Sequence, residues 1–143
     1  MKHSAVFAAL RLQGVSLQCL AVLSAMLDSS YMSAKLGRVT AQKVKMQRDL
    51  PQGAPESPLL FTLVTEMVLR PLLSRWAARG AGWKMDNLWL PAVCYADDVL
   101  LLGSSLDGLE AMLSEVVNAF AAVGLDVGPF HNPRKIGRAW VME

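Results

Sequence analysis

The stretch that decides the fold is Ala92–Gly103, with the sequence AVCYADDVLLLG. Two apolar, partly β-branched runs, Val93–Tyr95 and Val99–Leu102, flank a short acidic break. Runs of this length and composition predict two buried strands. The tight break between them predicts a β-hairpin with Ala96-Asp97-Asp98 at its tip.

This acidic pair is the first candidate for chemistry. Neighbouring side chains of a straight strand point to opposite faces, but a turn can bring two adjacent carboxylates to one end of a sheet. Unpaired buried charges are costly, so both groups should face solvent, pair with cations or bind metal. Mg²⁺ takes oxygen ligands, usually one or two carboxylates plus substrate phosphates. An ordinary polar turn is the alternative, because Asp side chains bond to nearby backbone in turns.

A second informative stretch is Leu50–Phe61, with the sequence LPQGAPESPLLF. Its prolines and glycine argue against regular structure before Ser57. Ser57 predicts a helix start with Pro58 at the first helical position, and the helix should run to about Ala78. Gly53 would let a nucleotide or template approach the backbone closely. The alternative is an ordinary turn before a helix.

Three further segments have helical patterns. The segments Ser4–Gly14 and Ser16–Asp28 predict packing helices without chemistry of their own. A third, amphipathic helix should follow Ser104-Ser105 and end at Gly124. Its apolar face recurs every three or four residues and comprises Leu109, Met112, Leu113, Val116, Val117 and Phe120.

The segments Tyr31–Val39 and Gln42–Arg48 predict two strands joined by a turn. Lys43 and Lys45 alternate with apolar residues, which is typical of a half-buried strand. The cationic side chains of this region are Lys35, Arg38, Lys43, Lys45 and Arg48. They indicate either a solvated edge that discourages sheet aggregation or a contact with phosphates.

Length and composition narrow the class of protein. The chain has 143 residues, which suits one domain, and its 53% hydrophobic content can fill a core. A net charge of +2 barely favours a polyanion, so a nucleic-acid surface would be local. Two cysteines form no disulfide framework or zinc spacing, and Cys94 is predicted to be a small core residue. Without a convincing signal peptide or apolar span, we expect an intracellular protein with no membrane partner.

The two motifs together resemble a known family. The segment Pro51–Phe61 resembles the segment that leads into the palm helix of reverse transcriptases, the RNA-directed DNA polymerases. The string Tyr95–Asp98 resembles their catalytic hairpin, and the order of motifs and helices also matches. The closest group is the non-LTR (LINE-like) retrotransposon type. This resemblance implies an α+β fold in which residues 1–128 form a partial palm. A small antiparallel sheet with a catalytic-type hairpin would pack on helices, and residues 129–143 would form an irregular tail.

The resemblance also implies site residues. Asp97 and Asp98 would be the catalytic carboxylates and would bind Mg²⁺, of which the intact family uses two ions. Gln52 and Gly53 would line the incoming nucleotide and template, and Tyr95 would lie near the primer end. Possible phosphate contacts are Lys43, Lys45 and Lys135. The partners would be an RNA template, a DNA primer and a deoxynucleoside triphosphate, whose α-phosphate the primer 3′-hydroxyl attacks.

One departure from the family pattern concerns the first catalytic aspartate. In the family it lies on a strand just before the helix that His3–Gln13 resembles, and this sequence starts too late to contain it. The fingers and thumb are also missing, so we expect weak metal binding and no polymerase activity from the chain without the missing segments. Two alternatives stay open. One is a non-catalytic nucleic-acid-binding retroelement remnant that uses Lys35, Arg38, Lys43 and Lys45. The other is a helix-rich structural protein with an accidental acidic motif.

Overall fold

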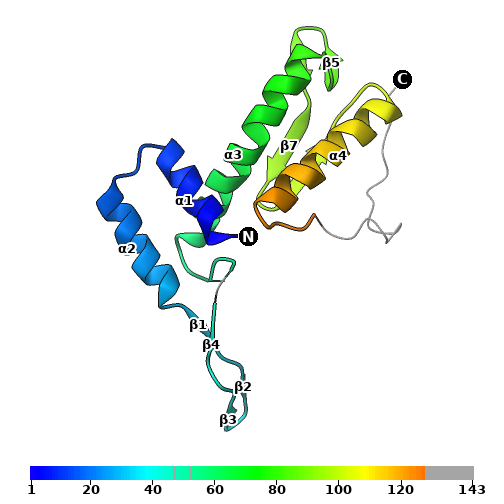
Figure 1. The fold of residues 1–143 in the computed structure, drawn as a ribbon. Coiled ribbons are helices and arrows are strands. Elements are labelled where there is room, and N and C mark those ends of the chain that lie inside the picture. Colours follow the sequence, from blue (N-terminus) through cyan, green and yellow to red (C-terminus); the bar gives the residue numbers. More distant parts are fainter. Residues whose placement is uncertain (47, 52, 128–143) are drawn as a thin grey trace. The chain divides into compact units, whose positions relative to one another are not determined.

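The computed structural model describes residues 1–46, 48–51 and 53–127, which belong to two compact units, Met1–Val64 and Thr65–Glu143. The described residues contain four helices and four two-stranded sheets, all antiparallel (Figure 1). The predicted α+β class is therefore confirmed. The predicted domain span of 1–128 stays a prediction, and the predicted tail, residues 129–143, lies outside the described residues.

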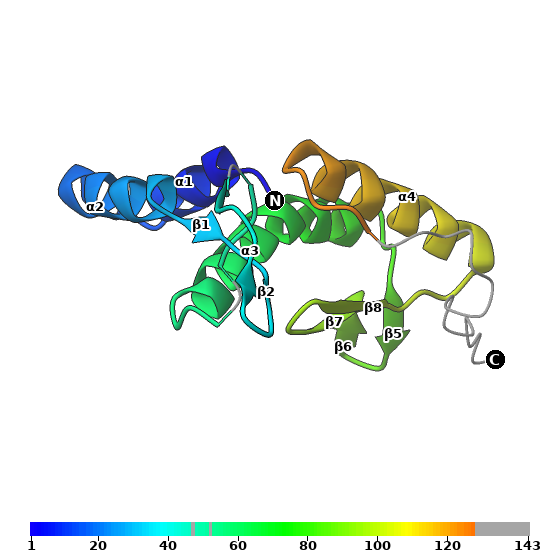
Figure 2. The same ribbon diagram turned by 90° about the horizontal axis from the view of Figure 1, so that it is seen from below.

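The first unit begins with two helices, α1 (His3–Leu12) and α2 (Leu17–Asp28). The buried side chains of α1 are Ala5, Val6, Ala9 and Leu10. Ser16 caps α2, because its hydroxyl accepts a hydrogen bond from the Cys19 amide at 3.4 Å. Both segments are helical as predicted, and Figure 2 shows α1 and α2 as consecutive helices.

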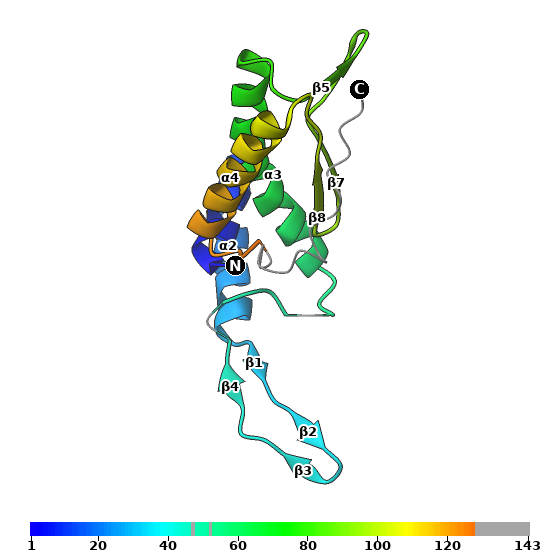
Figure 3. The same ribbon diagram turned by 90° about the vertical axis from the view of Figure 1, so that its right-hand side faces the viewer.

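A thin β arm follows α2 (Figure 3). It pairs β1 (Tyr31–Met32) with β4 (Val44–Lys45), and β2 (Lys35–Leu36) with β3 (Val39–Thr40). We call residues 31–45 the basic arm. The prediction of a half-buried strand is wrong, because Val44 is exposed. Irregular residues interrupt the ladder between the two short sheets, so no continuous apolar face forms for a core to cover.

Helix α3 (Ser57–Ala78) has the predicted extent and continues through Pro71. It begins at Ser57, whose hydroxyl donates to the Pro51 carbonyl at 2.7 Å and ties the preceding loop to the first turn. It ends in a Schellman motif: Gly80 adopts a φ of 68°, and the Ala81 amide donates to the Trp76 carbonyl at 2.9 Å.

Among the described residues, α3 is the one helix whose length and composition would allow it to cross a membrane. Its mean hydropathy over the best window is 1.2, and a third of that window is buried. Core helices of this length and composition meet the same criterion, so the feature is weak evidence for a membrane span.

The second unit adds two hairpins and a helix after α3. Its elements are β5 (Trp83–Met85), β6 (Leu88–Leu90), β7 (Ala92–Tyr95), β8 (Asp98–Leu101) and α4 (Leu106–Ala122). The sequence did not predict the β5–β6 hairpin as such, although Asp86, at its turn with a φ of 51°, is a residue type that tolerates this conformation.

Helix α4 confirms the predicted amphipathic segment and both of its ends. Ser105 caps it, accepting a hydrogen bond from the Gly108 amide at 3.2 Å. At the other end Gly124 has a φ of 74°, and the Leu125 amide donates to the Phe120 carbonyl at 3.0 Å. Buried side chains of this unit come from both helices: Val68, Leu69, Leu72 and Trp76 on α3, and Met112, Val116 and Phe120 on α4.

Candidate functional site

The candidate site is the tip of the β7–β8 hairpin. Tyr95 pairs with Asp98, so Ala96 and Asp97 form a two-residue turn. Ala96 has a φ of 51°, a conformation that costs a non-glycine residue on the order of 1 kcal/mol. Such strained residues cluster at active sites. The predicted hairpin is confirmed, with Asp97 in the turn and Asp98 as the first residue of the returning strand.

The side chains around this tip are exposed, and this corrects one prediction. Asp97 and Asp98 are both exposed, and Tyr95 keeps 82% of its surface accessible. The strands were predicted to be buried, but Val93 is exposed as well, and Cys94 is an exposed thiol rather than a core residue. The reason is that β8 lies against α4, whereas most of β7 remains accessible.

The two carboxylates of the tip are not neutralised by neighbouring cations. Within the described part of the chain, neither Asp97 nor Asp98 has an ion-pair partner. Exposed carboxylate oxygens are donors that suit Mg²⁺. The described residues contain no group of three His, Cys, Asp or Glu side chains close enough to hold a metal ion. The hairpin therefore offers two carboxylates, and further ligands would have to come from substrate, water or residues beyond those described.

The remaining predicted site residues do not belong to this hairpin or to the described part of its unit. Gly53 belongs to the first unit and has a φ of 87°, with open space where a side chain would be. Lys43 and Lys45 lie on or beside β4 of the basic arm. Gln52 and Lys135 lie outside the described residues.

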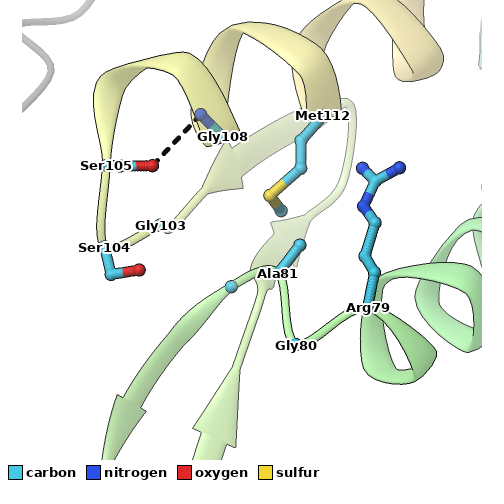
Figure 4. Close-up of a pocket in the computed structure, with 9 residues that line it drawn as sticks. Arg79, Gly80, Ala81, Gly103, Ser104, Ser105, Gly108 and Met112 are labelled. Carbon is cyan, nitrogen blue, oxygen red and sulfur yellow. Dashed lines mark hydrogen bonds between the residues drawn. The ribbon is translucent and has the colours of Figure 1, made fainter.

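A cavity of about 290 Å³ lies in the second unit where α3 ends and α4 begins (Figure 4). Its lining comprises the Arg79–Gly82 turn, the Gly103–Ser105 linker, Gly108 and Met112. Its lining among the described residues contains no acidic side chain, so these residues do not offer the ligands that a magnesium site needs.

A cluster that the sequence did not predict joins α3 to α4. Glu115 accepts hydrogen bonds from Trp76 Nε1 at 3.0 Å and from Arg79 Nη1 at 2.6 Å, and Arg75 Nη2 lies 3.8 Å away. Partial burial raises the pKa of Glu115, but the hydrogen bonds from Arg79 and Trp76 and both arginine charges outweigh it, so the pKa is lowered overall. No sequence pattern signals this cluster, because Trp76 and Arg79 lie 39 and 36 residues before Glu115 in the sequence.

Comparison with known proteins identifies the family of this chain. The family model described as "Reverse transcriptase (RNA-dependent DNA polymerase)" matches residues 6–130. A Pol polyprotein from the type-1 retrotransposable element R2 of Nasonia vitripennis is 28% identical over 129 residues, which cover 90% of this chain and 12% of that protein.

Two other relatives match shorter segments. The R2DM Pol polyprotein of Drosophila melanogaster is 36% identical over 78 residues, covering 54% of this chain and 7% of that protein. A Gag-Pol polyprotein of Rous sarcoma virus is 36% identical over 88 residues, covering 62% of this chain and 5% of that protein. Because the family model extends over most of the sequence, the chain belongs to the reverse transcriptase (RNA-dependent DNA polymerase) family, and it corresponds to a small part of the length of its retroelement relatives.

Proposed function

We propose that the β7–β8 hairpin supplies two carboxylates of a nucleotidyl-transfer site in a retrotransposon-type reverse transcriptase. Reverse transcriptases bind an RNA template, a primer and deoxynucleoside triphosphates, and they generally depend on Mg²⁺. The single observation that carries the proposal is the strained two-residue turn with two exposed carboxylates and no ion-pair partner within the described residues. Solvated carboxylates without cationic partners remain free to bind a metal.

Each residue of the hairpin tip has a proposed role. Asp97 would be a direct metal ligand, and Asp98 would complete or support the acidic site. Bound Mg²⁺ would supply stabilisation of negative charge on the transferring phosphate. Tyr95, on the strand beside the turn, would contact the primer end. Gly53 would leave room for the nucleotide or template, because glycine has no side chain. Its backbone also adopts a left-handed conformation that favours glycine.

The roles of the residues outside the described structure rest on the family resemblance alone. Gln52 would line the nucleotide together with Gly53, and Lys135 would contact a phosphate. We also propose that the 143-residue chain does not polymerise DNA by itself. The hairpin offers two carboxylates, and misplacement of a catalytic geometry by about an ångström can cost roughly 10²-fold in rate.

Paramagnetic titration tests the metal role. Mn²⁺, which replaces Mg²⁺ at oxygen sites, should broaden the amide resonances of Asp97 and Asp98 before others, and Asp97→Asn should abolish this. Asp86→Asn is the matched control, because Asp86 is also an exposed aspartate at a hairpin turn. Broadening that is uniform over exposed aspartates, or that persists in Asp97→Asn, would refute the proposal.

A second function, contact with a nucleic-acid backbone, is favoured by the basic arm. The arm contributes four cationic side chains and Arg48, just beyond it, a fifth, and no acidic residue lies between Asp28 and Asp49. The nine other cationic residues of the chain are outnumbered by its twelve acidic ones, so positive charge is concentrated here. Lys35, Arg38 and Lys43 are exposed and have no ion-pair partner among the described residues, whereas Lys45 Nζ lies 4.0 Å from Asp28. Concentrated exposed cations are what phosphate binding requires.

Salt-dependent RNA binding tests this second function. Lys43→Ala with Lys45→Ala should weaken binding and lower the slope of log affinity against log salt by about one for each phosphate that the variant no longer neutralises. Lys84→Ala, which removes an exposed cation from β5 in the other unit, is the control. Equal reductions in affinity for the control and the arm variant would show that the arm has no specific part.

A further inference from the structure

We propose that Glu115 is a positioning residue: it clamps α4 to α3 and thereby orients the β7–β8 hairpin that carries Asp97 and Asp98. The inference rests on the proposed function, because only that function gives Asp97 and Asp98 a role for which their orientation matters. Its physical basis, however, is a closed set of contacts within the second unit that does not depend on any metal.

The clamp itself is a carboxylate shared by one buried and one exposed hydrogen-bond donor, with Arg75 as a second ion-pair partner. Trp76 is fully buried, with 0% of its surface accessible, and its indole N–H donates to Glu115 Oε2. Arg79 donates to the other oxygen, Oε1. Removal of the acceptor takes away the hydrogen-bond partner of this indole N–H, which is unfavourable for a buried side chain, so the hydrogen bond favours one position of α4 along α3.

The turn that follows α3 packs against the residues that lead into β7. Trp89 Nε1 donates to the Ala81 carbonyl at 2.9 Å, directly after the helix. At Gly82, a Cβ atom would lie 2.8 Å from Trp89 Nε1 and 3.0 Å from the Pro91 side chain. Pro91 immediately precedes β7, so the chain enters the hairpin from a tightly packed point beside α3.

The start of α4 anchors the other side. The Leu102 amide donates to the Pro91 carbonyl at 2.9 Å and extends the ladder by one pair beyond β8. A Cβ atom at Gly103 would lie 2.9 Å from Leu109 Cγ, on the first turn of α4. Both ends of the hairpin are therefore attached to helices that Glu115 joins.

The hairpin needs this external support. A two-stranded sheet is at best marginally stable in water without packing partners, and most side chains of β7 are exposed. The orientation of Asp97 and Asp98 therefore follows from the α3–α4 frame and not from the hairpin's own packing. The cavity in Figure 4 lies inside this frame, between the Arg79–Gly82 turn and the Gly103–Ser105 linker, and it leaves room for the frame to shift when the clamp is removed.

Hydrogen exchange on the full 143-residue chain tests the clamp without metal. In Glu115→Ala, the Leu102 amide should exchange on the order of tenfold faster, as expected when a buried hydrogen bond is broken. The exchange rate of the Ser29 amide, which donates a hydrogen bond to the Ala25 carbonyl in the other unit, should be unchanged. Glu110→Gln is the matched control, because it removes a carboxylate from the exposed surface of the same helix. Glu115→Gln keeps one acceptor oxygen and provides a milder variant if the alanine variant does not fold.

The Mn²⁺ titration separates positioning from general stability. At a temperature where wild type and Glu115→Gln are both fully folded, the variant should bind Mn²⁺ at Asp97 several-fold more weakly, while Glu110→Gln binds like wild type. Unchanged Leu102 exchange in both Glu115 variants, or unchanged Mn²⁺ affinity despite faster Leu102 exchange, would overturn the inference. Faster Leu102 exchange in the Glu115 variants of a chain whose wild type binds no Mn²⁺ would instead support the frame and refute the proposed metal site.

Discussion

The Trp76–Glu115 hydrogen bond makes a quantitative prediction about stability. Removal of the acceptor by Glu115→Ala leaves the indole N–H of a fully buried side chain without a partner, which costs about 1–3 kcal/mol. The ion pairs with Arg75 and Arg79 contribute less, because these arginine side chains are 62% and 43% exposed, and exposed pairs are worth about 0–1 kcal/mol each. We therefore expect Glu115→Ala to lower the free energy of unfolding by roughly 2–3 kcal/mol.

A double-mutant cycle isolates the buried hydrogen bond. Trp76→Phe removes the donor but keeps an aromatic ring in the core, so in this background Glu115→Ala should cost only about 1 kcal/mol. The expected coupling free energy is then about 1–2 kcal/mol. Urea unfolding followed by circular dichroism measures it, because Trp76→Phe changes the intrinsic tryptophan fluorescence of the chain, whereas the circular dichroism of the helices is comparable in all four variants. If the stability losses of Trp76→Phe and Glu115→Ala add to within about 0.3 kcal/mol in the double variant, the reasoning is refuted. Glu66→Ala is the control: it removes an exposed ion pair with Arg70 and should change stability by only about 0.3–0.5 kcal/mol.

Three further predictions concern the second unit. The pKa of Glu115 is lowered in the folded state, so its carboxylate stabilises the fold above the ordinary pKa of 4.5, and this stabilisation is lost as pH falls through the folded pKa; Glu115→Gln should accordingly lose less stability than wild type in acid titrations that pass below pH 4.5. Met112→Ala should cost roughly 2–4 kcal/mol in urea unfolding, because the side chain is fully buried, whereas Leu106→Ala on an exposed position of the same helix should cost under about 1 kcal/mol. Gly124→Ala should lower the melting temperature by several degrees, because a φ of 74° strains alanine by about 1 kcal/mol or more; an unchanged value would show that the Schellman turn rearranges at no cost.

Several features could be predicted because they depend on local physics. The Asp97–Asp98 hairpin follows from two strand-forming runs around a short acidic break, and a two-residue turn is a local solution. The ends of α4 follow from Ser105 and Gly124. The Ser105 side chain accepts a hydrogen bond from a free amide at the start of the helix, and the flexible Gly124 backbone lets the Leu125 amide bond to a free carbonyl at its end, so neither end needs a distant residue. The acidic motif and the Pro-Gln-Gly loop in their order were also sufficient to indicate the family.

Other features depended on the tertiary structure. A continuous apolar run predicted a buried strand at Val93, and alternation predicted a half-buried strand at Val44. Both side chains are exposed, because burial depends on what lies above a strand and not on its own pattern. The Glu115 clamp also escaped the sequence, since its donors come from a helix more than thirty residues away and only chain folding brings them together. Sequence alone therefore determined the hairpin and the acidic residues at its tip, whereas tertiary packing decided which side chains are exposed and which distant residues meet at Glu115.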